Sequence, residues 1–167
     1  MHKYISIQTE VFDSAEEERM LRRGNPRIGA VVSFLGLMRD INDGDQVNTM
    51  TLEHYPGMTE KALAAIVDEA ERRWDLEGVR VVHRVGELRP EEPIVLVLAA
   101  SRHRGEAFRA CEFVIDYLKT RAPFWKKEST PEGERWVSAR HSDSEAEARW
   151  REEPGSGVKN VIRVTKE

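Results

Sequence analysis

The sequence is poor in cysteine, in long apolar stretches and in net positive charge. Its one cysteine, Cys111, excludes an internal disulfide and any zinc site built from several thiolates. The longest uninterrupted apolar stretch, residues 94–100, is much shorter than the ~20 residues that cross a bilayer. The 26 Lys and Arg residues face 30 Asp and Glu residues, so the net charge of -4 gives the whole molecule no attraction to nucleic acid. These features predict a cytoplasmic protein in which any anion-binding site is local.

The chain of 167 residues has the length of about one domain. Apolar residues recur at helical spacing over residues 59–74 and again over residues 107–118. Ser14 followed by Glu17 is typical of a capping box and predicts a short helix that ends near Arg23. Alternating or β-branched apolar runs predict strands over residues 4–9, 28–36, 50–55, 79–85, 94–101, 135–139 and 158–164.

Several predicted strands follow one another without an intervening helix. This order favours an α+β domain with a largely antiparallel sheet and three helices over a doubly wound parallel sheet. The strands at 79–85 and 94–101 are expected to pair as neighbours. The acidic segment 39–48 is expected to form a mobile loop, through which the strands on either side of it make a hairpin. The sequence contains no G-x-G-x-x-G or P-loop pattern, so it does not support a nucleotide site of those kinds.

Three cationic residues, Arg102, His103 and Arg104, precede the predicted helix at 107–118. A helix N-terminus favours anions, so cations at this position suggest a compensating anion such as a phosphate group. A solvated turn that binds nothing is the alternative interpretation.

Two lysines lie in positions that restrict their side chains. Lys119 borders the apolar stripe of the predicted helix, and Lys126 follows the rigid segment 123–125. Crowding with Arg121 and Lys127 would lower the pKa of these amines toward the range in which an amine acts as a base or nucleophile. Exposed, inert lysines are the alternative interpretation.

The remaining reactive side chains give weaker signals. Cys111 shares a helical stripe with Phe108 and Ile115, which predicts a buried, inert thiol, so any sulfur chemistry needs an outside donor. His54 and His83 lie within predicted strands, and no pair of histidines has the spacing of metal ligands. No metal site is expected.

Several segments together resemble the large, catalytic subunit of molybdopterin synthase. The segments that carry this resemblance are LEHYPGMTEKAL (52–63), HRVGEL (83–88), SRHRGEAF (101–108), DYLKTRAPFWKKE (116–128) and PEGERWV (131–137). The resemblance runs in order from about Tyr4 to Trp150. It implies one catalytic-subunit-like domain over residues 1–150 and leaves residues 151–167 as a C-terminal tail of unknown role.

The resemblance implies an α/β hammerhead-like fold and a sulfurtransferase activity without a cofactor. The implied substrate is cyclic pyranopterin monophosphate, which receives two sulfurs to form the dithiolene of molybdopterin. The implied sulfur donor is the C-terminal Gly-Gly thiocarboxylate of a small ubiquitin-like carrier subunit. The implied assembly is a heterotetramer, with a central homodimer of large subunits and a small subunit at each outer end.

The resemblance also implies roles for individual residues. Lys119 is expected to meet the carrier tail, and Lys126 is expected to assist proton transfer or hold the substrate. The residues expected to bind the substrate are Leu37, Met38, Arg39, His103, Arg104, Lys127, Glu128 and Arg140. The arginines suit a phosphate group because their contacts are bidentate and charge-assisted. Two other functions stay open, namely a noncatalytic subunit that docks the tail of a ubiquitin-like protein, and nucleic-acid binding, which the net charge disfavours.

Overall fold

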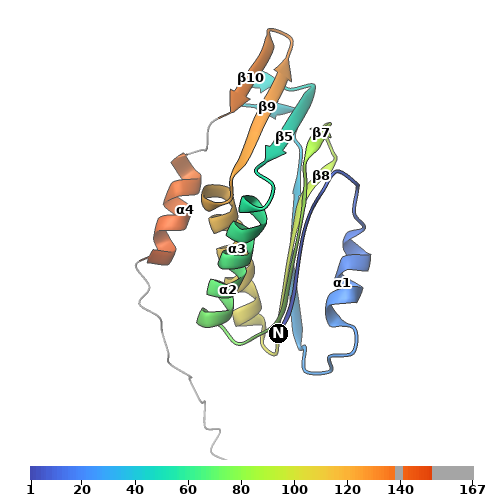
Figure 1. Ribbon diagram of the computed structural model, residues 1–167, viewed down its shortest axis with the longest axis vertical. Helices are drawn as coiled ribbons and strands as arrows, with labels where there is room; N and C mark the ends of the chain where they lie inside the picture. The colour runs from blue at the N-terminus through green and yellow to red at the C-terminus, as the bar shows by residue number, and fades with distance from the viewer. Residues whose placement is uncertain (138–140, 152–167) are drawn as a thin grey trace, which may run out of the picture.

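The computed structural model describes residues 1–137 and 141–151, which form an elongated α+β molecule (Figure 1). One sheet stands between helix α1 on one face and helices α2 and α3 on the other. A second sheet extends beyond one end of this layered body. The α+β class predicted from the order of the strands is therefore confirmed.

The first sheet has four strands, of which the inner two are buried along most of their length. In spatial order they are β1 (His2–Gln8), β6 (Leu76–Arg84), β8 (Pro93–Ser101) and β2 (Ala30–Leu37). β6 and β8 pair in antiparallel register, as expected for the segments 79–85 and 94–101. β1 pairs with β6 in parallel, whereas β2 pairs with β8 in antiparallel register. Coverage on both faces explains why β8 is apolar nearly without a break and why every residue of β6 is buried, including its charged ones.

Helices cover both faces of this sheet. α2 (Met58–Arg73) and α3 (Arg104–Arg121) pack on one face through an apolar core that includes Leu63, Val97 and Phe113. These two helices match the two predicted apolar stripes.

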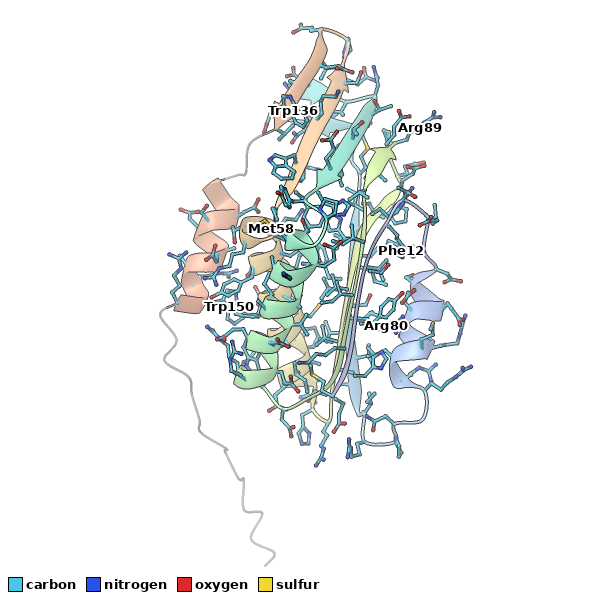
Figure 2. The ribbon with its side chains drawn as sticks, viewed as in Figure 1. Phe12, Met58, Arg80, Arg89, Trp136 and Trp150 are labelled. Carbon is cyan, nitrogen blue, oxygen red and sulfur yellow. The ribbon has the colours of Figure 1, made fainter. Side chains whose placement is uncertain are left out.

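The opposite face of the sheet carries α1 (Ser14–Arg22). Figure 2 shows Phe12 and Arg80 between this helix and the sheet. The predicted start of α1 was wrong by one residue, because the Asp13 side chain accepts hydrogen bonds from the N–H groups of Ala15 and Glu16 and so caps the helix.

The second sheet is antiparallel throughout. In spatial order its strands are β10 (Gly133–Val137), β9 (Phe124–Thr130), β5 (Thr49–His54) and β7 (Gly86–Leu88). The sequence predicted β5 and most of β10 but neither β9 nor β7. Buried side chains that include Met50, Leu52 and Leu88 form a small apolar core under this sheet.

The acidic segment between β2 and β5 is a small hairpin rather than a mobile loop. β3 (Ile41–Asn42) and β4 (Asp45–Gln46) pair in antiparallel register. Asp43 and Gly44 connect them with φ angles of 52° and 83°, which is the backbone of a tight hairpin turn. The expected hairpin between the flanking strands was also wrong, because β2 and β5 belong to different sheets.

A fourth helix, α4 (His141–Arg151), packs against α3. Its residue Trp150 lies edge-on to Trp74 and Phe113, and its indole N–H donates to Asp116 at 2.7 Å. The expectation of three helices was therefore one too low for the described residues. The predicted strand at 158–164 lies outside the described residues. Within the described part of the chain, no helix is long and apolar enough to cross a membrane.

Candidate active site

A cavity of about 270 Å³ lies where the two sheets meet the end of α3. The end of β2, the β3–β4 hairpin, β5, β6, α3 and β9 all contribute to its wall. Its apolar lining includes Leu37, Met38 and Met50, and its charged lining includes Arg39 and Glu128. An apolar cavity with a few polar groups that converge on it is the usual form of a small-molecule site.

Lys119 and Lys126 both line this cavity. Lys119 lies in the last turn of α3, where the helix dipole favours a positive charge. The helix ends at Arg121, and after Ala122 and Pro123 the chain continues as β9, whose alternation brings Phe124, Lys126 and Glu128 to the cavity side. Two lysines seven positions apart therefore share one cavity, as the sequence predicted.

Glu128 is a buried carboxylate on the cavity wall. It accepts a hydrogen bond of 2.6 Å from the Asn42 side chain and two of 3.1 Å from Arg135. Arg135 also reaches Asp45 at 2.6 Å and the Asn42 carbonyl at 3.2 Å. Through these contacts Arg135 and Glu128 attach the β3–β4 hairpin to β9 and β10.

His83 also lines the cavity, although the sequence pattern predicted no role for it. Its side chain comes from β6, and its ring stacks on Phe124 with 3.9 Å between the ring centroids. Burial, together with the smaller effects of the nearby charges of Lys119 and Lys126, lowers the pKa of His83 to about 3. The ring is therefore neutral at physiological pH.

Comparisons with known proteins show to which family this chain belongs. The family model described as MoaE protein matches residues 7–121. The chain belongs to the MoaE family. The molybdopterin synthase catalytic subunit of Ralstonia nicotianae is 64% identical over 87% of this chain and 83% of that protein.

Solved structures agree with this membership of the MoaE family. The molybdopterin biosynthesis MoaE protein from Burkholderia ambifaria is 56% identical, covers 92% of this chain and 100% of its own, and superposes with a TM-score of 0.78. Molybdopterin synthase from Staphylococcus aureus is 34% identical, covers 80% of this chain and 96% of its own, and has a TM-score of 0.74.

Three residues expected in the pocket of this MoaE-family chain lie away from the cavity, and a fourth, Arg140, is outside the described residues. His103 and Arg104 stand at the N-terminal end of α3, at the opposite end of the helix from Lys119. Lys127 lies on the other face of β9 from Lys126, where its ammonium group lies 3.3 Å from Glu134 and 5.8 Å from the Trp136 ring centroid. Strand alternation thus places the Lys127 side chain away from the cavity of its own chain.

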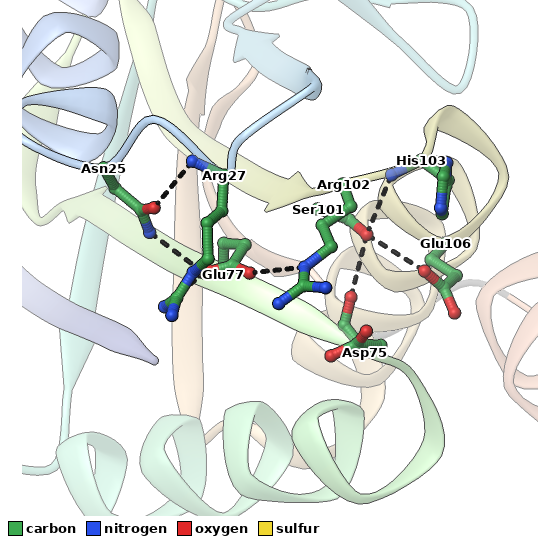
Figure 3. A network of polar contacts seen from close by, with 8 residues as sticks. All are labelled: Asn25, Arg27, Asp75, Glu77, Ser101, Arg102, His103 and Glu106. Carbon is green, nitrogen blue, oxygen red and sulfur yellow. Dashed lines mark hydrogen bonds and ion pairs between the residues drawn. The ribbon is translucent and has the colours of Figure 1, made fainter.

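One of the cations before α3, Arg102, has an anionic partner within the chain. Figure 3 shows Arg102 on the Glu77 carboxylate, which also accepts from Asn25 and Arg27. The Ser101 hydroxyl accepts from the His103 N–H. The hydrogen bond from Asn25, together with those from Arg102 and Arg27, lowers the pKa of Glu77 to about 2. Glu77 therefore compensates the charge of Arg102, one of the cations that suggested a bound anion.

Cys111 is buried, as expected. Its thiol donates weakly to the Val97 carbonyl at 3.6 Å, and burial raises the pKa of the thiol to about 12. Among the described residues, no group of three or more His, Cys, Asp or Glu side chains is placed to hold a metal ion.

Proposed function

We propose that this chain is the catalytic subunit of a molybdopterin synthase. The observation that carries the proposal is the shared cavity of Lys119 and Lys126 beside the exposed Arg39. Membership of the MoaE family and the names of close relatives support it. The cavity has room for a small bicyclic or tricyclic ligand, and its cations suit a phosphate ester and a carboxylate-like tail.

The proposed substrate is cyclic pyranopterin monophosphate, and the proposed sulfur donor is the C-terminal thiocarboxylate of a small ubiquitin-like subunit. The thiocarboxylate sulfur bonds to a side-chain carbon of the substrate and displaces an oxygen substituent, which leaves with a proton. Water then cleaves the bond between the acyl carbon and sulfur, so that the carrier departs as a carboxylate. A second carrier repeats both steps and completes the dithiolene.

The roles of the cavity residues follow from their positions. The Lys119 ammonium neutralises the carrier's acyl oxygen, and Lys126 supplies the proton to the leaving oxygen. Arg39 at the rim holds the phosphate, which retains the half-converted substrate between the two rounds. Holding both reactants in one cavity can supply several kcal/mol of the required barrier reduction.

We further propose that His103 and Arg104 act on the phosphate from a second copy of this chain. At 1.5 Å per residue, the 18 residues of α3 separate its two ends by roughly 25 Å. These side chains therefore do not meet Lys119 of their own chain. In a homodimer within a heterotetramer, the start of α3 from one copy would complete the cavity of the other.

Replacement of Lys119 tests the proposed function. The Lys119→Ala variant, incubated with thiocarboxylated carrier and cyclic pyranopterin monophosphate, should form no dithiolene product, because the charge opposite the acyl oxygen is gone. Circular dichroism and sedimentation should show an unchanged fold and assembly. Normal product formation by this variant would remove Lys119 from the mechanism. A wild-type chain that binds the carrier without converting substrate would be a docking subunit instead.

A further inference from the structure

Cleavage of the acyl–sulfur bond by water is the step of the proposed reaction that still lacks a proton acceptor. Water is a weak nucleophile, and a positioned general base speeds its attack by roughly 10²- to 10⁴-fold. Hydrolysis to a carboxylate and a thiolate also releases both protons of the water molecule. Lys126, which gives up one proton in the first step, can take back only one of them. The chemistry therefore calls for a second acceptor in the same cavity.

Of the described residues, two carboxylates line the cavity wall, Glu128 and Asp143. Both oxygens of Glu128 are engaged, because Oε1 accepts from Asn42 and Oε2 from Arg135. A carboxylate bound by a guanidinium group is a poor base. Within the described part of the chain, no hydrogen bond or ion pair ends on the Asp143 side chain. Asp143 is therefore the cavity carboxylate that is available to water.

The burial pattern of α4 shows which side of this helix carries Asp143. Glu147 and Trp150 are buried and Asp143 is half-buried, and these three residues have the i, i+4, i+7 spacing of one helical face. Residues 144–145 and 148–149 are exposed. An acidic residue in a first turn interacts favourably with the helix dipole on either side of a helix, so the dipole does not explain why Asp143 is on the inward side.

Contacts between α3 and α4 determine where along α3 this face ends. Trp150 donates to Asp116 at 2.7 Å, and one turn earlier Glu147 accepts from Arg121 at 3.0 Å. The two helices therefore run in opposite directions, and the first turn of α4 lies toward the second sheet (Figure 1). One further turn back from Glu147 brings Asp143 past the last residue of α3, where the cavity lies.

We propose that Asp143 is the general base that activates water for cleavage of the acyl–sulfur bond. Asp143 takes one proton as the water oxygen bonds to the acyl carbon. The carbon–sulfur bond then breaks, and its electron pair leaves with the sulfur as a thiolate. The second proton passes from the new carboxylic acid to Lys126, which becomes an ammonium group again, and Asp143 returns its own proton to bulk water. The inference rests on the proposed function and adds a catalytic residue to its second step.

Separate measurement of the two chemical steps tests this assignment. The assembled enzyme is mixed with thiocarboxylated carrier and cyclic pyranopterin monophosphate, and quenched samples are weighed by mass spectrometry for the covalent carrier–substrate adduct. We expect Asp143→Asn to form the adduct within about threefold of the wild-type rate but to hydrolyse it at least about 100-fold more slowly. Asp68→Asn, which removes a carboxylate paired with Lys3 on α2, is the matched control and should change neither rate. Adduct hydrolysis at the wild-type rate in Asp143→Asn would overturn the proposal.

Two further measurements separate a general base from a purely structural role of Asp143. The indole N–H resonance of Trp150, which donates to Asp116, shows whether α4 stays packed on α3 and should not move in Asp143→Asn. Formate should raise the rate of adduct hydrolysis by Asp143→Ala at least about tenfold, because it replaces the missing carboxylate. A shifted Trp150 resonance without rescue by formate would mean that Asp143 only supports α4, which contradicts the inference.

The same assay distinguishes failure of this inference from failure of the proposed function. A wild-type enzyme that forms neither adduct nor dithiolene would refute the proposed function and the inference with it. A wild-type enzyme that completes the dithiolene, beside an Asp143→Asn variant that completes it equally fast, would refute the inference alone.

Discussion

Lys126 and Lys127 are adjacent in the sequence but have opposite surroundings. Lys126 lines the cavity, whereas Lys127 faces Glu134 and the exposed Trp136 on the other side of β9. We expect Lys126→Ala to lower the rate of dithiolene formation by at least about 100-fold, the range of a lost general acid. Lys127→Ala should lower it by less than about threefold, because exposed pairs contribute little. Single-turnover assays measure the rate of both variants directly. Equal losses of rate would show that the contribution of a lysine does not depend on whether it faces the cavity.

For single residues, the sequence pointed to the two cavity lysines but not to the cavity histidine. The residue pattern predicted only that two lysine side chains are restricted, and the family resemblance implied a common site for them; Lys119 and Lys126 do line one cavity. His83 was missed because a single histidine in a β-branched strand has the pattern of an ordinary core residue. Only the stacking on Phe124, which follows His83 by 41 positions in the chain, reveals its place in the cavity.

Among the elements, the β3–β4 hairpin is attached to the second sheet in part by Arg135. Arg135 joins Asp45 and the Asn42 carbonyl to the buried Glu128. We expect Arg135→Ala to lower the free energy of unfolding by about 2 kcal/mol, because it leaves a buried carboxylate without its cation. Amide exchange at residues 41–46 should become faster, since the hairpin loses the hydrogen bonds that Arg135 donates to it.

The control for this variant is Arg89→Ala. Arg89 lies 3.7 Å from Glu87, and both side chains are well exposed, so its removal should cost less than about 0.5 kcal/mol. Urea unfolding of the two variants, followed by hydrogen exchange, measures both effects. An Arg135→Ala hairpin that exchanges as slowly as the wild type would show that other contacts hold it.

Elements with an apolar face were predicted, and elements whose inward face is polar were not. β9 turns Lys126 and Glu128 inward, so its sequence lacks the alternation of apolar residues that indicates a strand. α4 has Trp150 as its large apolar anchor among mostly charged neighbours, which is too little for a periodic stripe. The two-residue strands β3 and β4 were signalled only by Asp43-Gly44, a dipeptide that favours tight hairpins.

For the whole molecule, paired carboxylates predict a loss of stability in acid. The pKa of Glu77 in the folded chain is about 2, below the 4.5 of an unperturbed glutamate, so the unfolded chain takes up this proton first. The stabilisation is therefore complete above pH 4.5 and disappears as the pH falls from 4.5 to about 2. We expect thermal unfolding of Glu77→Gln to occur below the wild-type temperature at pH 7 and to approach it at pH 2.5.

Glu87→Gln is the matched control, because Glu87 is exposed and lies 3.7 Å from Arg89. Its unfolding temperature should follow the wild type at every pH. His83 acts in the same direction as Glu77, since burial keeps its folded pKa near 3 while the unfolded residue protonates near 6.5. A Glu77→Gln variant with the full acid sensitivity of the wild type would exclude Glu77 as a source of that sensitivity.

The parallel pairing of β1 with β6 sets the order in which the chain can be completed during synthesis. β1 leaves the ribosome well before its partner, which begins at Leu76, after α1, β2 and α2 have been made. Until then Ile5 and Ile7 belong to an unpaired nascent strand that can associate with other chains. Contacts between such distant segments form slowly. β1 is thus translated long before β6 yet incorporated only with it, and during this interval the newly made chain most needs chaperone protection.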